Sequence, residues 1–150
     1  MMELPLSLLT VSPEETRALG ASLAPRFEAE PSLPPFVAMY GDLGVGKTAF
    51  VSGFAEVLAP GKAVRSPTFA LVNEYRVAGY KPLFHFDMYR ITSDDDLYSI
   101  GYDDYLDEGI CLCEWCENIP DALPPERLEV RISKIPEDER ARRIEIVRIP

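Results

Sequence analysis

Residues 41–48 read Gly-Asp-Leu-Gly-Val-Gly-Lys-Thr and match the pattern G-x-x-x-x-G-K-[ST]. The short apolar run 36–40 precedes this segment, and residues 49–58 after it have the character of a helix. Glycines let a backbone wrap closely around an anion and direct its N–H groups at phosphate oxygens. A strand before the loop and a helix after it are the context that this pattern requires. The segment therefore predicts a nucleoside triphosphate site, with a fortuitous glycine-rich turn as the alternative.

The fixed positions of this loop have separate chemical roles. Lys47 can reach the β- and γ-phosphates, and the Thr48 hydroxyl can ligate Mg²⁺. The helix that begins here adds the positive end of its dipole. The residues of this segment that we expect to contact the nucleotide are Asp42, Gly44, Val45, Gly46, Lys47, Thr48 and Ala49.

Short apolar segments that alternate with helices indicate an α/β fold. The expected buried or paired strands comprise residues 36–40, 69–75, 82–86 and 110–113. The expected helices begin at Ser12, which can act as the N-cap, at Ala49 and at Ser93. We expect the first to continue as one helix until Pro31, and Gly101 to end the third.

Residues 128–132 and 143–147 alternate polar and apolar side chains, which predicts an antiparallel pair at a sheet edge. We therefore predict one phosphate-loop NTPase-like domain over residues 1–150. Its central sheet should be mostly parallel, with an antiparallel C-terminal hairpin and helices on both faces.

Two of the apolar strands end in an acid, Asp87 and Glu114. Ligands of open parallel sheets bind at the carboxyl ends of the strands, so both acids should lie near the glycine-rich loop. Asp87 is the candidate Walker-B-type acid for Mg²⁺, and Glu114 could ligate the metal or orient the attacking water. The alternative is that one of them only caps a turn or pairs with Arg90. Trp115 could stack on the base or simply pack.

The segment Ser66-Pro67-Thr68-Phe69 places a hydroxyl between the loop helix and the next strand. A threonine in this place can sense the γ-phosphate through Mg²⁺, and a plain turn is the alternative. His85 is more typical of a core residue, or of one that supports a ligand, than of a catalytic base.

Two further groups of residues carry weaker signals. Arginines 140, 142 and 143 are typical of a solvated edge, with a partner or RNA contact as the alternative. Cysteines 111, 113 and 116 indicate buried reduced thiols rather than a metal or redox centre.

The net charge of −10, from 15 Lys and Arg against 25 Asp and Glu, opposes unaided binding to nucleic acid. No apolar run approaches the about 20 residues that span a bilayer, and the first residues lack the features of a secretory signal. These observations predict a cytoplasmic protein without a membrane association.

Together, these motifs resemble the TsaE (YjeE) family, the ATPase subunits of bacterial tRNA threonylcarbamoyladenosine biosynthesis. The resemblance extends from about Leu9 to Val147. The matching stretches are residues 41–48, Ser66-Pro67-Thr68-Phe69, Leu71-Val72-Asn73-Glu74-Tyr75, His85-Phe86-Asp87-Met88-Tyr89-Arg90 and Glu114-Trp115. Ala49 and Cys116 depart from the family, which usually has a hydroxyl residue and a proline at these positions.

The resemblance implies an ATPase that requires Mg²⁺, is slow alone and is activated by TsaB and TsaD. It implies that tRNA, modified at adenosine 37, is reached only through that complex. The implied residue roles are phosphate binding by Lys47, Mg²⁺ binding by Thr48 and Glu114, an essential acid at Asp87, a switch-like position at Thr68 and nucleotide contact at Trp115. A non-catalytic nucleotide switch and a small-molecule phosphate-loop kinase are the alternative functions.

Overall fold

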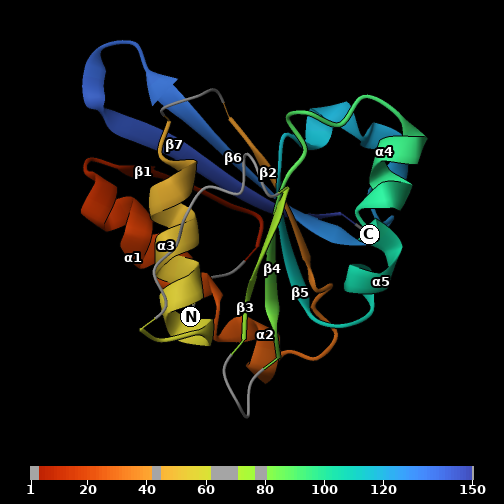
Figure 1. Ribbon diagram of the computed structural model, residues 1–150. Coiled ribbons are helices and arrows are strands. Elements are labelled where there is room, and N and C mark those ends of the chain that lie inside the picture. Colours follow the sequence, from red (N-terminus) through yellow and green to blue (C-terminus); the bar gives the residue numbers. More distant parts are fainter. Residues whose placement is uncertain (1–3, 42–44, 62–70, 77–80, 150) are drawn as a thin grey trace.

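The computed structural model describes residues 4–41, 45–61, 71–76 and 81–149. Seven strands form a single sheet in the order β1-β7-β6-β2-β5-β4-β3 (Figure 1). The strands are β1 (Leu6–Thr10), β2 (Phe36–Tyr40), β3 (Val72–Tyr75), β4 (Leu83–Asp87), β5 (Ile110–Glu114), β6 (Arg127–Ile135) and β7 (Asp138–Ile149).

The four middle strands, β6, β2, β5 and β4, are parallel to one another. The flanking pairs β1–β7, β6–β7 and β3–β4 are antiparallel. Strands β2, β4 and β5 are almost wholly buried because both of their faces are covered, as is usual for parallel strands. This arrangement confirms the α/β class and the parallel centre of the sheet.

The C-terminal hairpin does not form the edge of the sheet, contrary to our prediction. Strand β6 pairs with β2, and β1 covers the outer side of β7 in the register Leu8↔Ile144. We did not predict β1, because its five residues carry little local signal and it becomes a strand by pairing with the far end of the chain. Alternation alone marks a strand as half-buried, and it does not say whether another strand lies beside it.

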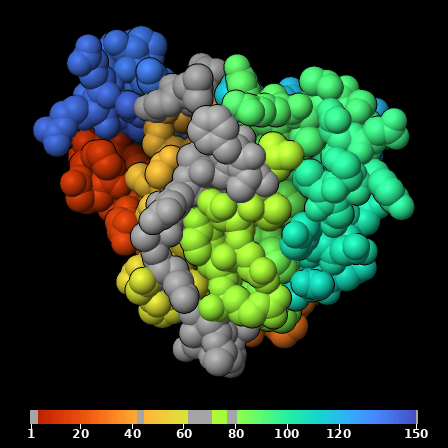
Figure 2. Space-filling model, viewed as in Figure 1, coloured from red at the N-terminus to blue at the C-terminus, as the bar shows by residue number. Residues whose placement is uncertain are grey.

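The helices lie on both faces of the sheet, as predicted (Figure 1). They are α1 (Pro13–Leu23), α2 (Arg26–Ala29), α3 (Lys47–Leu58), α4 (Asp94–Ser99) and α5 (Tyr102–Leu106), with 3-10 turns η1 (Cys116–Asn118) and η2 (Pro120–Ala122). Helices α1 and α3 lie side by side on one face, and α4 and α5 lie on the other (Figure 2). No helix in the described ranges is long and apolar enough to cross a membrane.

Helix α1 begins where the sequence predicts. The Ser12 hydroxyl accepts a hydrogen bond from the Glu15 N–H at 3.2 Å, and the Glu15 carboxylate reaches back to the Val11 N–H at 3.0 Å. The predicted single helix up to Pro31 is wrong, because α1 ends at Leu23 and α2 begins at Arg26. Pro25 lies at the break, where its missing N–H cannot continue the helical ladder.

Two glycines hold α1 and α3 in close contact. A Cβ atom on Gly53 would lie 1.8 Å from the Arg17 carbonyl oxygen, and one on Gly20 would lie 2.1 Å from the Phe50 carbonyl oxygen. The backbones therefore touch at two points, which no larger residue allows. This contact fixes the direction of α3, and with it the position of its N-terminus.

The helix predicted to begin at Ser93 and to end at Gly101 is confirmed as α4. Ser93 caps α4 by accepting from the Asp96 N–H at 3.2 Å, and Gly101 follows its end with a φ of 74°. Gly101 then begins α5, which we did not predict. Its five residues, including two aspartates, show no extended apolar period.

Candidate functional site

Strand alternation places the two predicted acids on the face that α3 covers. Leu83 on β4 and Leu112 on β5 belong to the core under α1 and α3, whereas Phe86 belongs to the core on the other face. Asp87 and Glu114 have the same parity as Leu83 and Leu112, so they point toward α3. They are also register partners on adjacent parallel strands. The structure thus brings both acids together at the carboxyl edge of the sheet.

Lys47 begins α3 directly beside these acids. Its side chain is buried, with 6% of the residue exposed, and its Nζ lies 4.0 Å from Glu114 Oε1. The same Nζ donates a hydrogen bond to the Gly41 carbonyl at 2.7 Å and lies 4.9 Å from the centre of the Trp115 ring. A buried ammonium group is therefore placed between the glycine-rich loop and a carboxylate.

The backbone at both ends of the loop requires glycine. Gly41 has a φ of 152°, and a Cβ atom there would lie 2.6 Å from the Ile132 carbonyl oxygen. Gly46 has a φ of 111° and caps the N-terminus of α3. The first amide N–H groups of a helix have no acceptor within the helix, so the start of α3 presents donors to an anion. Asp42 and Gly44 lie outside the described residues.

Glu114 has a partner that sequence reasoning did not assign. Its Oε2 is hydrogen-bonded to Nε2 of His85 at 2.5 Å, and both residues are buried, with 9% and 1% exposed. The Nδ1 atom of His85 is buried and has no hydrogen-bond partner among the described residues. The signal was present in the sequence, since His85 lies two residues before Asp87 on the same strand and so shares its face.

Asp87 is tied to the chain that leaves β4. Its Oδ1 accepts a hydrogen bond from the Tyr89 N–H at 2.9 Å, so this carboxylate does cap the following turn. It is 6% exposed and remains at the same edge as Glu114. The predicted role of Asp87 in binding Mg²⁺ stays a prediction beside this observed cap.

Trp115 follows Glu114 in a left-handed conformation with a φ of 61°. Its ring packs against Tyr89, with centroids 4.9 Å apart, and against the Lys47 ammonium. Thr48 is exposed next to Lys47, and Ala49 is half-buried. Thr68 lies outside the described residues, so its predicted place near the site stays a prediction.

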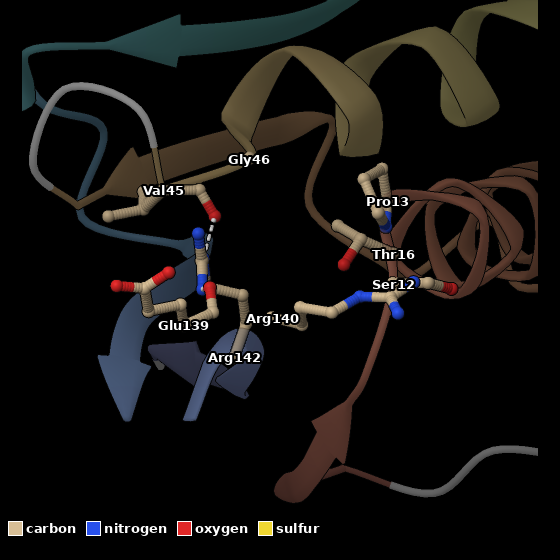
Figure 3. A pocket seen from close by; sticks show the side chains of 8 residues that line it. All are labelled: Ser12, Pro13, Thr16, Val45, Gly46, Glu139, Arg140 and Arg142. Atoms are coloured by element: carbon tan, nitrogen blue, oxygen red, sulfur yellow. Dashed lines mark hydrogen bonds between the residues drawn. The ribbon is translucent and has the colours of Figure 1, made fainter. Parts of the chain in front are cut away.

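A cavity of about 320 Å³ lies beside the end of the loop (Figure 3). Its lining residues are Ser12, Pro13, Thr16, Val45, Gly46, Glu139, Arg140 and Arg142. Arg142 of β7 donates from Nε to the Val45 carbonyl at 3.0 Å, and Figure 3 shows Arg140 extending toward the Ser12 side. The expectation of a solvated edge is therefore wrong for Arg142. The missed signal is long-range, because 97 residues separate Arg142 from Val45.

The metal-binding chemistry available here is that of oxygen ligands. Within the described part of the chain, no three His, Cys, Asp or Glu side chains are grouped as a metal site. Cys111, Cys113 and Cys116 are free thiols buried in the core under α4 and α5, away from the acids. Burial raises the pKa of Cys111 to about 12, so this thiol is neutral and a poor ligand.

The sequence is similar to a known protein family and to named relatives. The family model described as "Threonylcarbamoyl adenosine biosynthesis protein TsaE" matches residues 10–144. A Bacillus subtilis protein named tRNA threonylcarbamoyladenosine biosynthesis protein TsaE is 44% identical over 132 residues, covering 87% of this chain and 79% of the relative. A Haemophilus influenzae protein of the same name is 38% identical over 112 residues, covering 74% and 68%.

The crystal structure of Bacillus subtilis YdiB is similar to this one, with a TM-score of 0.75 and 35% sequence identity. The match covers 100% of this chain and 89% of YdiB. The shared architecture and the family match over most of the sequence lead to one conclusion: this chain belongs to the TsaE family, which is involved in tRNA threonylcarbamoyladenosine biosynthesis.

Proposed function

We propose that this chain is a phosphate-loop ATPase that binds ATP with Mg²⁺ and hydrolyses it while acting with a TsaB–TsaD-type complex on tRNA adenosine 37. The observation that carries the proposal is the meeting of Lys47 with Glu114 and Asp87 at the N-terminus of α3. A buried cation, helix N–H groups and two carboxylates are the groups that a metal-chelated triphosphate needs.

The phosphates bind at the start of α3. Lys47 exchanges the Gly41 carbonyl, which it contacts at 2.7 Å, for phosphate oxygens. The first N–H groups of the helix and the backbone of residues 41–46 donate to the same oxygens. Asp42, Gly44, Val45 and Gly46 act through their backbone, since the required groups are amides.

The donor set of the site fits Mg²⁺ that arrives with the nucleotide. Mg²⁺ is usually held by one or two carboxylates, a hydroxyl, waters and substrate phosphates rather than by a cage of protein ligands. Glu114, Asp87 and the exposed Thr48 hydroxyl supply such a set. These three side chains would hold the ion, which would supply positive charge against the phosphates.

The adenine and ribose occupy the cavity beside Val45 and Gly46 (Figure 3). Pro13 and Val45 give this cavity apolar lining, while Ser12 and Arg140 give it polar lining. Arg142 fixes the end of the loop through the Val45 carbonyl. Trp115 lies beside the Lys47 ammonium, and Trp115 and Ala49 are the further residues that we assign to nucleotide contact.

Hydrolysis proceeds by in-line attack of water on the γ-phosphate, where catalysis depends on positioning and charge neutralisation. Glu114 and Asp87 hold the metal and the water, and Thr68 senses the γ-phosphate. The partner complex carries the tRNA contacts, because a chain with a net charge of −10 repels a phosphate backbone. A partner that supplies a cation to the site accelerates turnover by about 10³-fold or more.

Calorimetry with ATP and Mg²⁺ tests the binding step. Wild-type protein should bind, and Lys47→Ala should lose binding because it removes the buried cation. Lys81→Ala, which removes an exposed lysine at the opposite end of β4, is the matched control and should bind as wild type does. Absence of binding by the wild type overturns the proposal.

Turnover and tRNA modification test the role. The ATPase rate should be low for the chain alone and rise when a TsaB–TsaD complex is added, and tRNA modification should depend on the chain. Partner affinity that depends on the nucleotide, without hydrolysis in the complex, would favour the non-catalytic switch. ATP consumption that requires a small hydroxylated acceptor would favour the kinase.

A further inference from the structure

We propose that His85 is a positioning residue, whose imidazole donates Nε2–H to Oε2 of Glu114 and thereby keeps Oε1 of that carboxylate available for the metal-bound nucleotide. The inference rests on the proposed function, because it assigns a task to the side chain beside Glu114. The two carboxylate oxygens of Glu114 have different surroundings, with His85 at Oε2 and the Lys47 ammonium 4.0 Å from Oε1.

The register of β4 and β5 produces this contact. His85 pairs with Leu112, and Asp87 pairs with Glu114, so the histidine lies two register positions before the two acids and on the same face. The side chain of Glu114 reaches back along the sheet to the imidazole. Both strands are buried along their whole length, so the backbone positions from which the two side chains start are fixed.

The buried environment decides which ring nitrogen carries the proton. Nδ1 of His85 is buried and has no partner among the described residues, so a proton there would be an unsatisfied donor. Nε2 faces a carboxylate oxygen, which accepts a hydrogen bond. A proton on Nε2 makes the hydrogen bond to Glu114 and leaves no donor without a partner at Nδ1.

The hydrogen bond from His85 keeps the Glu114 carboxylate from forming a close ion pair with the Lys47 ammonium. The 4.0 Å between Lys47 Nζ and Glu114 Oε1 is at the outer limit of an ion pair. Without His85, the carboxylate could rotate onto the ammonium and occupy the cation that the phosphates need. A partner that orients a metal ligand in this way typically changes metal affinity by about 10- to 100-fold when it is removed.

Nuclear magnetic resonance of the single histidine tests the hydrogen bond directly, without any ligand. The chain has one His, so ¹⁵N-histidine labelling gives one imidazole spectrum. The expected spectrum shows a proton on Nε2 that exchanges slowly with water and whose signal shifts in Glu114→Gln. A ring without a proton on Nε2 would overturn the inference, whether or not the protein binds a nucleotide.

A pair of amide variants tests the consequence for the metal. The amide nitrogen of glutamine in His85→Gln can occupy the place of Nε2, whereas that of His85→Asn corresponds to Nδ1 and cannot reach Glu114. The measurement is the Mn²⁺ affinity of the complex with adenylyl imidodiphosphate, by electron paramagnetic resonance. His85→Asn should weaken it by about 10-fold or more, and His85→Gln should stay within about 3-fold of wild type.

The outcomes separate this inference from the proposed function. If both variants fold and retain the wild-type Mn²⁺ affinity, or lose it equally, the hydrogen bond does not position Glu114 and the inference fails. If the wild type binds no Mn²⁺ nucleotide, the proposed function fails, while the imidazole spectrum still reports on the hydrogen bond. If neither variant folds, the spectrum of the wild type and of Glu114→Gln decides.

Discussion

The two faces of the sheet use the same strands for different chemistry. On the face covered by α3, the ends of β4 and β5 carry His85, Asp87 and Glu114, which are polar and buried. On the opposite face the neighbouring positions are Phe86 and Cys113, which pack against α4 and α5. A strand covered on both sides can thus hold a charged site on one face because the other face supplies apolar packing. The following predictions test that division.

The largest expected effect comes from removing the negative charge of Asp87, on the face covered by α3. Asp87→Asn should lower ATP turnover by about a thousandfold, because the site loses a charge that acts on the metal and phosphates. The amide oxygen can still accept from the Tyr89 N–H, so the fold should be kept. The ATPase rate in the presence of the partner complex is the measurement.

Asp94→Asn is the matched control for this comparison. Asp94 is an exposed acid in the first turn of α4, on the other face, and the same substitution there should leave the rate unchanged. Equal losses in both variants would contradict the division between the faces.

A stability effect of about 3 kcal/mol is expected for Gly53→Ala, at the contact of α1 and α3. The added Cβ would lie 1.8 Å from a backbone oxygen of α1, so the two helices must separate. Urea unfolding measures the loss. Glu56→Ala, exposed on the same helix, is the control and should change the free energy of unfolding by less than about 0.5 kcal/mol. Equal stability of the two variants would show that α3 is not fixed by this contact.

The buried thiol of Cys111, on the face covered by α4 and α5, should lower the free energy of unfolding at high pH. Burial raises the pKa of Cys111 from 9.0 to about 12, so between these values the unfolded chain releases a proton that the folded chain retains. The free energy of unfolding therefore decreases as pH rises, by up to about 1.4 kcal/mol per pH unit for this group. Urea unfolding at pH 8 and pH 10.5 should show a smaller decrease in Cys111→Ala than in the wild type. The same decrease in both would contradict the assignment.

The smallest expected loss of stability comes from removing the serine that caps a helix on each face. Ser12→Ala should cost about 1 kcal/mol, because α1 packs along α3 and its fraying weakens that face. Ser93→Ala removes the same kind of hydrogen bond from the six-residue α4 and should cost less in global stability. Amide hydrogen exchange distinguishes the two, with increased exchange confined to α4 in Ser93→Ala. A larger global loss from Ser93→Ala would reverse the comparison.

Local patterns were sufficient for the elements that form the site. The run 36–40, the glycines and the lysine of the loop, and the acids that end β4 and β5 all carry their signal within a few residues. Their meeting at one edge then follows from parallel topology, because carboxyl ends of parallel strands share an edge. The Ser12 cap and the buried thiols were predictable for the same reason.

Contacts between distant parts of the chain were beyond such patterns. Strand β1 exists by pairing with β7, and Arg142 reaches Val45 across 97 residues. Pro25 is a local signal for the break between α1 and α2, because proline interrupts a helix. The apolar spacing of Leu23 and Phe27 nevertheless favoured one continuous helix.

The sequence by itself determined the chemistry of this protein: a loop that only glycines can form, a lysine at its end and two acids after apolar strands. Only the tertiary structure decided which oxygen of Glu114 meets His85 and which faces Lys47. The physical reason is that residue types set what a group can do, whereas register and helix packing set the distances. Hydrogen bonds act only over those short distances.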